Sequence, residues 1–302
     1  MDLKLIINDI ENHFDAKVLE NKYISSGASA DTYLFVLDTL PYKVVAKICK
    51  LNLKDLIQQE YETIKFISDK VECKLPKLYF FKEQLDFSYF VMEYFEGISC
   101  DTKSLLFRPK KKKLANEIVD NLIKIQTVKN DKFGMIENAA YDTWFDYYNE
   151  FAHEILEYTK TLEGLNSIVE KAVRLSSQNL DKILSSTKNA EPTLIHGDYW
   201  VPNFIIDKNK MELVGIIDPF HVMWAEPEYE LFCLTVGLGS KLHLYEIYKQ
   251  KVGVSAFCDL KIEMYALFNE LLWKKKGSNV HNAYLVMRSK RLIKQLKRNR
   301  FI

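Results

Sequence analysis

Three polar residues follow short apolar runs at a spacing that suits phosphoryl transfer. Asp198 and Asn203 lie in the run Leu194–Asn203, which reads Leu-Ile-His-Gly-Asp-Tyr-Trp-Val-Pro-Asn, and Asp218 lies in Gly-Ile-Ile-Asp-Pro at 215–219. Phosphoryl transfer needs a carboxylate that orients and deprotonates a hydroxyl, and oxygen ligands for the Mg²⁺ that bridges the phosphates. Because Mg²⁺ prefers hard oxygen ligands and keeps several waters, we expect Asp198 to be the catalytic base and Asn203 and Asp218 to bind the metal.

A turn of small residues near the N-terminus is a candidate phosphate-binding element. Two short β-rich runs within residues 23–36 flank this turn, as expected for a hairpin. Small residues allow backbone N–H groups to approach an anion closely. An ordinary β-turn explains the same pattern equally well, so both interpretations stay open. The turn consists of Ser26, Gly27, Ala28 and Ser29.

Lys47 lies within the apolar run Val44–Ile48. A strand that directs one lysine inward is the setting in which a lysine reaches the α- and β-phosphates of a nucleotide, although a solvated lysine is the alternative. The helix expected over 58–67 carries Glu60 and Glu62, either of which could pair with Lys47. We favour Glu60 because it lies beside the apolar face of that helix. A surface position remains the alternative for either glutamate.

The run Tyr89–Gly97 is an apolar strand that ends in a polar connection closed by glycine. In a two-lobed nucleotide-binding fold, this place offers backbone groups to the adenine edge, and Glu93, Tyr94 and Phe95 would then contact the base. A core strand that ends in a loop predicts the same string of residues.

Acidic and aromatic residues in the remaining two thirds are candidate substrate ligands. The segment 141–151 should be a helix with an aromatic core stripe, and its acids recur every four residues on a neighbouring face, where an amine-bearing substrate could lie. A solvated acidic face is the favoured alternative. Pro227 suits the first turn of a second helix. The candidate substrate residues are Asp142, Asp146, Trp224, Glu226 and Glu228.

Length and composition favour a large, helix-rich protein with two lobes, 1–96 and 97–302. The chain has 302 residues, of which 48% are hydrophobic and 27% charged, with only 10 Gly and 7 Pro. No secretory signal and no apolar run of about 20 residues is visible. The five cysteines are scattered, which indicates free thiols in a reducing compartment. We therefore expect a cytoplasmic location and no membrane span.

Positive charge is concentrated in the last 32 residues. The segment from Leu271 onward contains ten Lys and Arg and no acids, whereas the whole chain carries a net charge of +1. Leu285, Leu292 and Leu296 predict a docked amphipathic helix with a basic outer face. A solvated face is the favoured interpretation, and nucleic acid is not an expected partner because no nucleic-acid motif accompanies the charge.

The motif resembles the aminoglycoside phosphotransferase and choline kinase superfamily. His196-Gly197-Asp198, Asn203, Ile217-Asp218 and Pro227-Glu228-x-Glu230-Leu231 carry this resemblance. It implies an α+β, two-lobed protein-kinase-like fold with a small β-rich N-lobe and a larger helical C-lobe. It also implies that Asp198 is the base, that Asn203 and Asp218 bind magnesium, and that Lys47, backed by Glu60, binds phosphates.

Tyr199 and Pro219 depart from the residues common in this superfamily. The Asp-Pro pair, together with Trp200 in the motif, is similar to the fructosamine kinase, methylthioribose kinase and streptomycin kinase branches. The departures leave the acceptor undefined.

The resulting hypothesis is a small-molecule kinase that uses ATP or GTP with Mg²⁺ to phosphorylate a substrate hydroxyl. An antibiotic-modifying enzyme and a sugar or amine metabolite kinase are both consistent with it. The alternative is a catalytically silent kinase-like module that binds an anionic partner through its basic C-terminal helix. The oligomeric state is not predicted.

Overall fold

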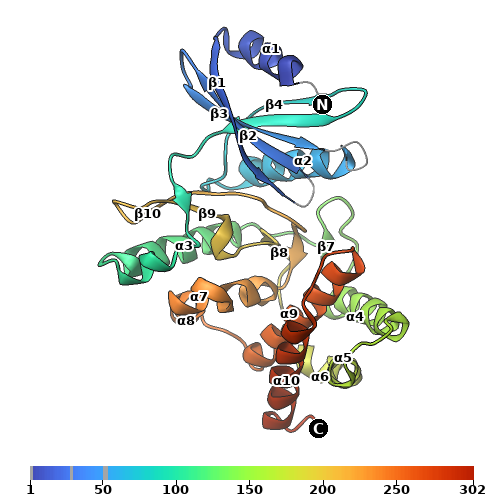
Figure 1. Cartoon of the computed structure of the whole chain (residues 1–302). Helices are drawn as coiled ribbons and strands as arrows, with labels where there is room; N and C mark the ends of the chain where they lie inside the picture. The colour runs from blue at the N-terminus through green and yellow to red at the C-terminus, as the bar shows by residue number, and fades with distance from the viewer. Residues whose placement is uncertain (1–2, 28–29, 50–53) are drawn as a thin grey trace. The chain divides into compact units, whose positions relative to one another are not determined.

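The computed structural model describes residues 3–27, 30–49 and 54–302, which form a mixed α+β fold (Figure 1). Contacts group the chain into two compact units, each described here by itself. Unit 1 comprises Met1–Lys110 and Pro202–Phe220, and unit 2 comprises Lys111–Val201 and His221–Ile302. The expected lobes, 1–96 and 97–302, were each one continuous segment. The contacts instead group the segment 202–220 with the N-terminal residues.

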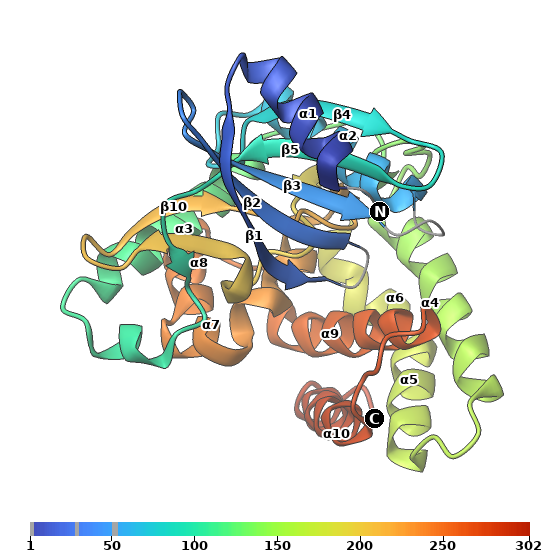
Figure 2. The same ribbon diagram turned by 45° about the horizontal axis from the view of Figure 1, so that its top comes forward.

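The main sheet of unit 1 has five antiparallel strands in the order β1-β2-β3-β5-β4 (Figures 1 and 2). Its strands are rich in Val, Ile, Tyr and Phe, the residues that pack well on a pleated surface. The first two strands form the hairpin expected from the sequence. The elements are α1 (Leu3–Phe14), β1 (Val18–Ser26), β2 (Ala30–Leu37), β3 (Lys43–Cys49), α2 (Lys54–Lys70), β4 (Leu78–Glu83) and β5 (Ser88–Glu93).

The two faces of this sheet bury different sets of side chains. Val44, Ala46 and Ile48 of β3 pack in one apolar cluster with α1, and Val45 packs in another with α2. Because successive strand residues point to opposite faces, Lys47 projects to the same face as Val45. The alternation along β3 therefore directs Lys47 toward α2.

A second, three-stranded sheet in unit 1 has the order β10-β9-β6. The Cys100 N–H donates to the Phe204 carbonyl at 2.8 Å, just beyond the pairing of β6 with β9. This backbone pairing explains why contacts place 202–220 with the N-terminal part. A side chain on Gly215 would overlap the Phe95 ring, which lies 2.0 Å from an added Cβ, so this position of β10 requires glycine. The remaining elements are β6 (Ile98–Ser99), η2 (Lys103–Phe107), η4 (Val201–Asn203), β9 (Phe204–Asp207) and β10 (Glu212–Ile216).

Unit 2 is largely helical, with a small sheet of order β7-β11-β8. Its single large apolar core includes Trp144 and Tyr148, as the predicted aromatic stripe requires, and also Leu285, Leu292 and Leu296 of the C-terminal helix. Figure 2 shows that helix, α10, beside α5 and α9. The bounds are α3 (Lys111–Ile125), β7 (Gly134–Met135), α4 (Trp144–Thr161), α5 (Ser167–Gln178), α6 (Leu180–Ile183), η3 (Leu184–Thr187), β8 (Thr193–Ile195), β11 (Met223–Ala225), η5 (Pro227–Thr235), α7 (Gly237–Lys241), α8 (Leu244–Val252), α9 (Cys258–Lys275) and α10 (Asn282–Arg298).

The helix predicted after Pro227 is present as the 3₁₀ helix η5, with the proline in its first turn. Within residues 3–27, 30–49 and 54–302, no helix is both long and apolar enough to cross a membrane.

Candidate active site

Lys47 pairs with two carboxylates of unit 1. Its Nζ lies 2.5 Å from Glu60 Oε1 and also contacts Asp218 Oδ1. Burial by itself would lower the pKa of Lys47, but the two carboxylates raise it above its usual value. The lysine therefore carries its charge at every physiological pH. The predicted pairing of Lys47 with Glu60 is confirmed, and Glu62 is exposed on the same helix.

Glu60 reaches Lys47 because of its place on α2. It follows Ile57 by three residues and precedes Ile64 by four, and both isoleucines are buried in the α2-side cluster. Residues at these spacings share one helix face, so Glu60 faces the sheet. Burial and Asp218 raise the pKa of Glu60, whereas Lys47 opposes them.

Asn203 and Asp218 flank the hairpin formed by β9 and β10. Phe204 pairs with Ile216, and the Ile217 N–H donates to the Asn203 carbonyl at 2.9 Å. The antiparallel register thus brings Asn203, which precedes β9, close to Asp218, which follows Ile217. Asp218 has a φ of +56°, a left-handed conformation that Asp tolerates better than most residues and that is often found at functional sites.

Other residues of unit 1 assigned to nucleotide binding have defined places. Ser26 ends β1, and the Gly27 N–H donates to the Ala30 carbonyl at 2.8 Å. Ala28 and Ser29 lie outside the described residues. Glu93 ends β5 and accepts from the Lys77 N–H, Tyr94 lies under the Lys43 ammonium, and Phe95 packs on Gly215.

In unit 2, Asp198 follows β8 in a turn that is fixed from several sides. Gly197 has a φ of +80°, and the Asp198 N–H donates to Nδ1 of the buried His196 at 3.4 Å. The Tyr199 hydroxyl donates to the Ile118 carbonyl of α3 at 2.6 Å. His196 therefore supports the turn, as its place beside a candidate base predicts.

Glu230 holds the backbone of this turn, a role that sequence reasoning missed. Its Oε1 accepts from the Gly197 N–H at 2.6 Å and its Oε2 from the His196 N–H at 3.2 Å. Burial raises the pKa of Glu230 to about 8, although these backbone N–H groups act in the opposite direction. The signal in the sequence was an acid placed among apolar residues of the helix that begins at Pro227.

A cavity of about 490 Å³ in unit 2 adjoins Asp198. Its volume lies within the range of small-molecule sites. Trp200, which lines the cavity, is 40% exposed. Glu270 supplies a second carboxylate, and burial raises its pKa, while Arg288 lowers it. The cavity is lined by Asp198, Trp200, Phe232, Cys233, Val236, Asn269, Glu270, Trp273, Ser278, Asn279, Val280, His281 and Tyr284.

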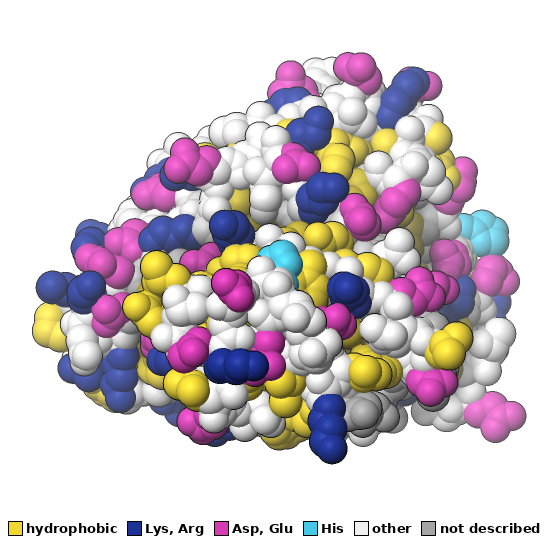
Figure 3. All heavy atoms as spheres, turned by 90° about the horizontal axis from the view of Figure 1, so that it is seen from above, with side chains coloured by type: hydrophobic (Ala, Val, Ile, Leu, Met, Phe, Trp, Pro, Cys, Tyr) yellow, Lys and Arg dark blue, Asp and Glu magenta, His cyan; other side chains and the backbone are white. Residues whose placement is uncertain are grey.

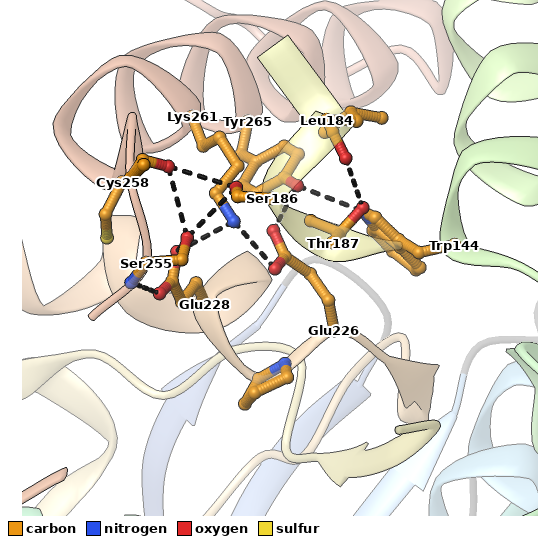
Figure 4. A network of polar contacts seen from close by, with 12 residues as sticks. Trp144, Leu184, Ser186, Thr187, Glu226, Glu228, Ser255, Cys258, Lys261 and Tyr265 are labelled. Carbon is orange, nitrogen blue, oxygen red and sulfur yellow. Dashed lines mark hydrogen bonds and ion pairs between the residues drawn. The ribbon is translucent and has the colours of Figure 1, made fainter. Parts of the chain in front are cut away.

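None of the five residues predicted to bind substrate lines this cavity, and two of them belong to a buried ionic network (Figure 4). Lys261 Nζ lies 2.8 Å from Glu226 and 2.7 Å from Glu228, and all three side chains are at most 8% exposed. Burial raises the pKa of Glu226, whereas Glu228 has a lowered pKa because Lys261 and Ser255 outweigh burial. The Tyr265 hydroxyl also donates to Glu226.

The other three also make contacts within unit 2. Asp142 is exposed and forms an ion pair with Lys132. Thr143 caps the start of α4, since the Asp146 N–H donates to Thr143 Oγ1 at 3.1 Å. The Thr143 hydroxyl in turn donates to Asp146 Oδ2 at 2.6 Å. Trp224 is buried in β11.

The basic C-terminal segment is partly neutralised inside unit 2. Arg288 is 1% exposed and donates to Glu263 at 3.0 Å and to the Tyr284 hydroxyl at 3.1 Å. Lys275 pairs with Glu154 at 2.6 Å. Figure 3, which shows another face of the molecule from above, has basic and acidic side chains interspersed. These ion pairs weaken the case for a dedicated anionic partner of the segment.

Comparison with known proteins identifies the class. The chain matches the phosphotransferase enzyme family over residues 20–249 and belongs to it. No curated protein sequence matches the chain.

Solved structures share the fold over nearly the whole chain. A putative fructosamine-3-kinase from Haemophilus somnus 129PT is 15% identical, with a TM-score of 0.72 and 96% of each chain covered. A thermostable mutant of aminoglycoside phosphotransferase APH(4)-Ia, bound to ADP and hygromycin B, is 14% identical with a TM-score of 0.68, covering 96% of this chain and 98% of that one. An aminoglycoside 2'-phosphotransferase-IIIa bound to GDP is 14% identical with a TM-score of 0.69, covering 99% and 100%. The expected α+β, kinase-like fold is therefore confirmed.

The raised pKa of Glu230 predicts how its replacement changes the pH dependence of stability. A carboxyl whose pKa rises on folding, here from 4.5 to about 8, stabilises the fold at low pH and loses that contribution as the pH rises through this range. In urea unfolding, the free energy of unfolding of wild type should fall by a few kcal/mol between about pH 5 and pH 8, relative to that of Glu230→Gln. The exposed Glu163→Gln serves as the control, and parallel stability curves for wild type and Glu230→Gln would contradict the prediction.

Proposed function

We propose that this protein transfers the γ-phosphate of ATP or GTP to a hydroxyl group of a small molecule, in a Mg²⁺-dependent reaction. The observation that carries the proposal is the place of Lys47, which pairs with both Glu60 and the candidate metal ligand Asp218. Membership of the phosphotransferase enzyme family supports the same reaction class. The nucleotides bound to solved structures of the same fold, ADP and GDP, are consistent with either donor.

The donor set in unit 1 suits magnesium better than a metal that needs several protein ligands. One amide oxygen and one carboxylate, from Asn203 and Asp218, flank the same hairpin, and Mg²⁺ completes its octahedron with water and phosphate oxygens. Within the described residues there is no group of three or more His, Cys, Asp and Glu side chains that could hold a metal. When bound, Mg²⁺ would neutralise charge on the phosphates.

The chain's own groups would act as follows. Lys47 would bind phosphate oxygens, and Glu60 would keep its ammonium oriented. Asp198 would accept the proton of the acceptor hydroxyl while the oxygen attacks the γ-phosphorus and the nucleoside diphosphate leaves. Glu230 would act only as a positioning residue, because it bonds to the backbone of the Asp198 turn rather than to reactants.

The cavity beside Asp198 defines what the acceptor should look like. Four aromatic side chains (Trp200, Phe232, Trp273 and Tyr284) offer flat apolar surfaces, to which the C–H face of a sugar or another ring can pack. Glu270 supplies one negative charge besides Asp198. The remaining lining residues include no Lys or Arg. We therefore favour a ring-bearing hydroxyl compound with one amine over a polycationic one.

Nucleotide binding should depend on both the metal and Asp218. Addition of Mg²⁺ with ATP or GTP should raise the Tm of wild type, because a ligand that binds the folded state stabilises it by about 2.7 kcal/mol at a hundred times its Kd. Asp218→Ala should lose the metal-dependent part of the shift. The exposed Asp142→Asn is the matched control. No shift of wild type with either nucleotide would overturn the proposed function.

The acceptor preference should depend on Glu270. Nucleotide consumption is measured with a panel of aminoglycosides, single amino sugars and neutral sugars. We expect Glu270→Gln to raise the KM for amine-bearing acceptors about tenfold, because a hydrogen bond to a charged group contributes about 1.5–3 kcal/mol. The KM of neutral acceptors should be unchanged. Asp142→Asn should leave every KM unaltered, since Asp142 does not line the cavity. If Asp142→Asn raised the KM for amine-bearing acceptors and Glu270→Gln left it unchanged, substrate binding would be assigned to Asp142 instead.

Removal of the proposed base should abolish turnover but not nucleotide binding. With the acceptor that gives the highest turnover, Asp198→Ala should lower kcat by about 10²–10⁴-fold, the usual contribution of general base catalysis. The Mg²⁺-dependent nucleotide shift of the variant should equal that of wild type, which shows that unit 1 is intact. A variant that retains more than about a tenth of the wild-type rate would rule out Asp198 as the base.

A further inference from the structure

Strand β1 is an unusually exposed sheet edge. It is the outer strand of the five-stranded sheet of unit 1, and among the described residues it pairs with β2 and with no other strand. Eight of its nine residues are exposed, including Leu19 at 67%, Tyr23 at 49% and Ile24 at 47%. The unpaired backbone groups of a sheet edge can receive another strand, and charged residues and bulges such as those of β1 limit which strands fit. The outer edge of β1 is therefore available for pairing with another strand.

The sequence of β1 is complementary to itself when read backwards. Residues 18–24 read Val-Leu-Glu-Asn-Lys-Tyr-Ile, with Asn21 at the centre. In an antiparallel pair of two copies centred on Asn21, Glu20 of each copy lies opposite Lys22 of the other. We propose that two copies of this chain associate through antiparallel pairing of their β1 strands.

The pairs that this arrangement forms are favourable ones. Directly opposed side chains on one face of an antiparallel pair stabilise the pair when they have opposite charges or are both apolar, and like charges destabilise it. Two-fold symmetry repeats the charged pair, so the regular part of the contact contains two Glu–Lys pairs, and the exposed apolar side chains of Leu19, Tyr23 and Ile24 lie beside them. Such a self-complementary patch is what a two-fold symmetric dimer requires.

The pattern also selects a single register. In an antiparallel pair, opposed residues must both direct their backbone groups toward or away from the partner strand. The register can therefore change only by steps that keep this alternation. One step in one direction places Glu20 opposite Glu20, and one step in the other places Lys22 opposite Lys22. Only the register centred on Asn21 brings opposite charges together at every charged position.

The local shape of β1 sets the strength of the contact. Irregularities between Val18 and Glu20 and between Tyr23 and Ser25 confine regular pairing with β2 to residues 20–23. The contact between two strands with so short a regular part is smaller than the interface of a stable complex, which buries about 1,200–2,000 Å². We expect a dimer with a micromolar rather than nanomolar Kd. The dimer does not depend on the proposed phosphotransferase reaction.

Charge exchange tests the register directly. Sedimentation equilibrium should show a monomer–dimer equilibrium for wild type, and Glu20→Lys and Lys22→Glu should each weaken self-association by at least about tenfold, because each places like charges opposite one another twice. An equimolar mixture of these two variants should form a heterodimer with wild-type affinity, since every charged pair is then complementary. The double variant Glu20→Lys/Lys22→Glu should also recover self-association.

The control is Lys65→Glu, which makes the same charge change on the exposed side of α2 and should dimerise as wild type does. Circular dichroism should be the same for all variants, because Glu20 and Lys22 are exposed. A wild-type protein that stays monomeric up to millimolar concentration would overturn the proposal. So would single variants that dimerise normally, or a mixture that forms no heterodimer.

Discussion

The ion pairs of Lys47 are the interaction on which the arrangement of unit 1 depends. They join β3 to α2, 13 residues further along the chain, and to the segment after β10, 171 residues further. A lysine that is only 12% exposed needs carboxylate partners, because an unpaired buried charge costs several kcal/mol. The pairs therefore hold the candidate phosphate-binding lysine in one place, and they also place Asp218 beside the five-stranded sheet of unit 1.

Local patterns explain which parts of this site could be predicted from the sequence. The alternation along β3 and the helical spacing of Glu60 each depend on neighbours in the chain, so the lysine and its partner were predictable. The Asp198, Asn203 and Asp218 motif was also visible, because its members lie at the ends of short apolar runs. Their roles in catalysis stay predictions, although the β9–β10 register explains why Asn203 and Asp218 belong together.

The remaining features depend on tertiary contacts. Glu226, Glu228 and Glu230 look alike in the sequence, yet the first two neutralise Lys261 and the third binds the backbone of the Asp198 turn. Burial and partner decide these roles, and neither can be read from the order of residues. The cavity residues come from the turn after β8, from η5 and the residue that follows it, and from α9, α10 and the connection between these two helices. These segments are far apart in the sequence, so local patterns could not predict that they line one cavity.

The two acidic regions of unit 2, Glu226 with Glu228 around Lys261 and Glu270 in the cavity, differ in their electrostatic surroundings. The carboxylates around Lys261 are desolvated and satisfied by a cation and by hydroxyl donors, so a ligand would have to displace protein contacts to reach them. Glu270 is only partly buried and faces a cavity lined by aromatic rings. A ligand amine there would gain a charged partner and lose little solvation, because rings and carboxylate replace water together. The number of acids in the sequence therefore exceeds the number of carboxylates that a ligand in the cavity could contact. The small number in the cavity argues against the polycationic acceptor among the proposed ones.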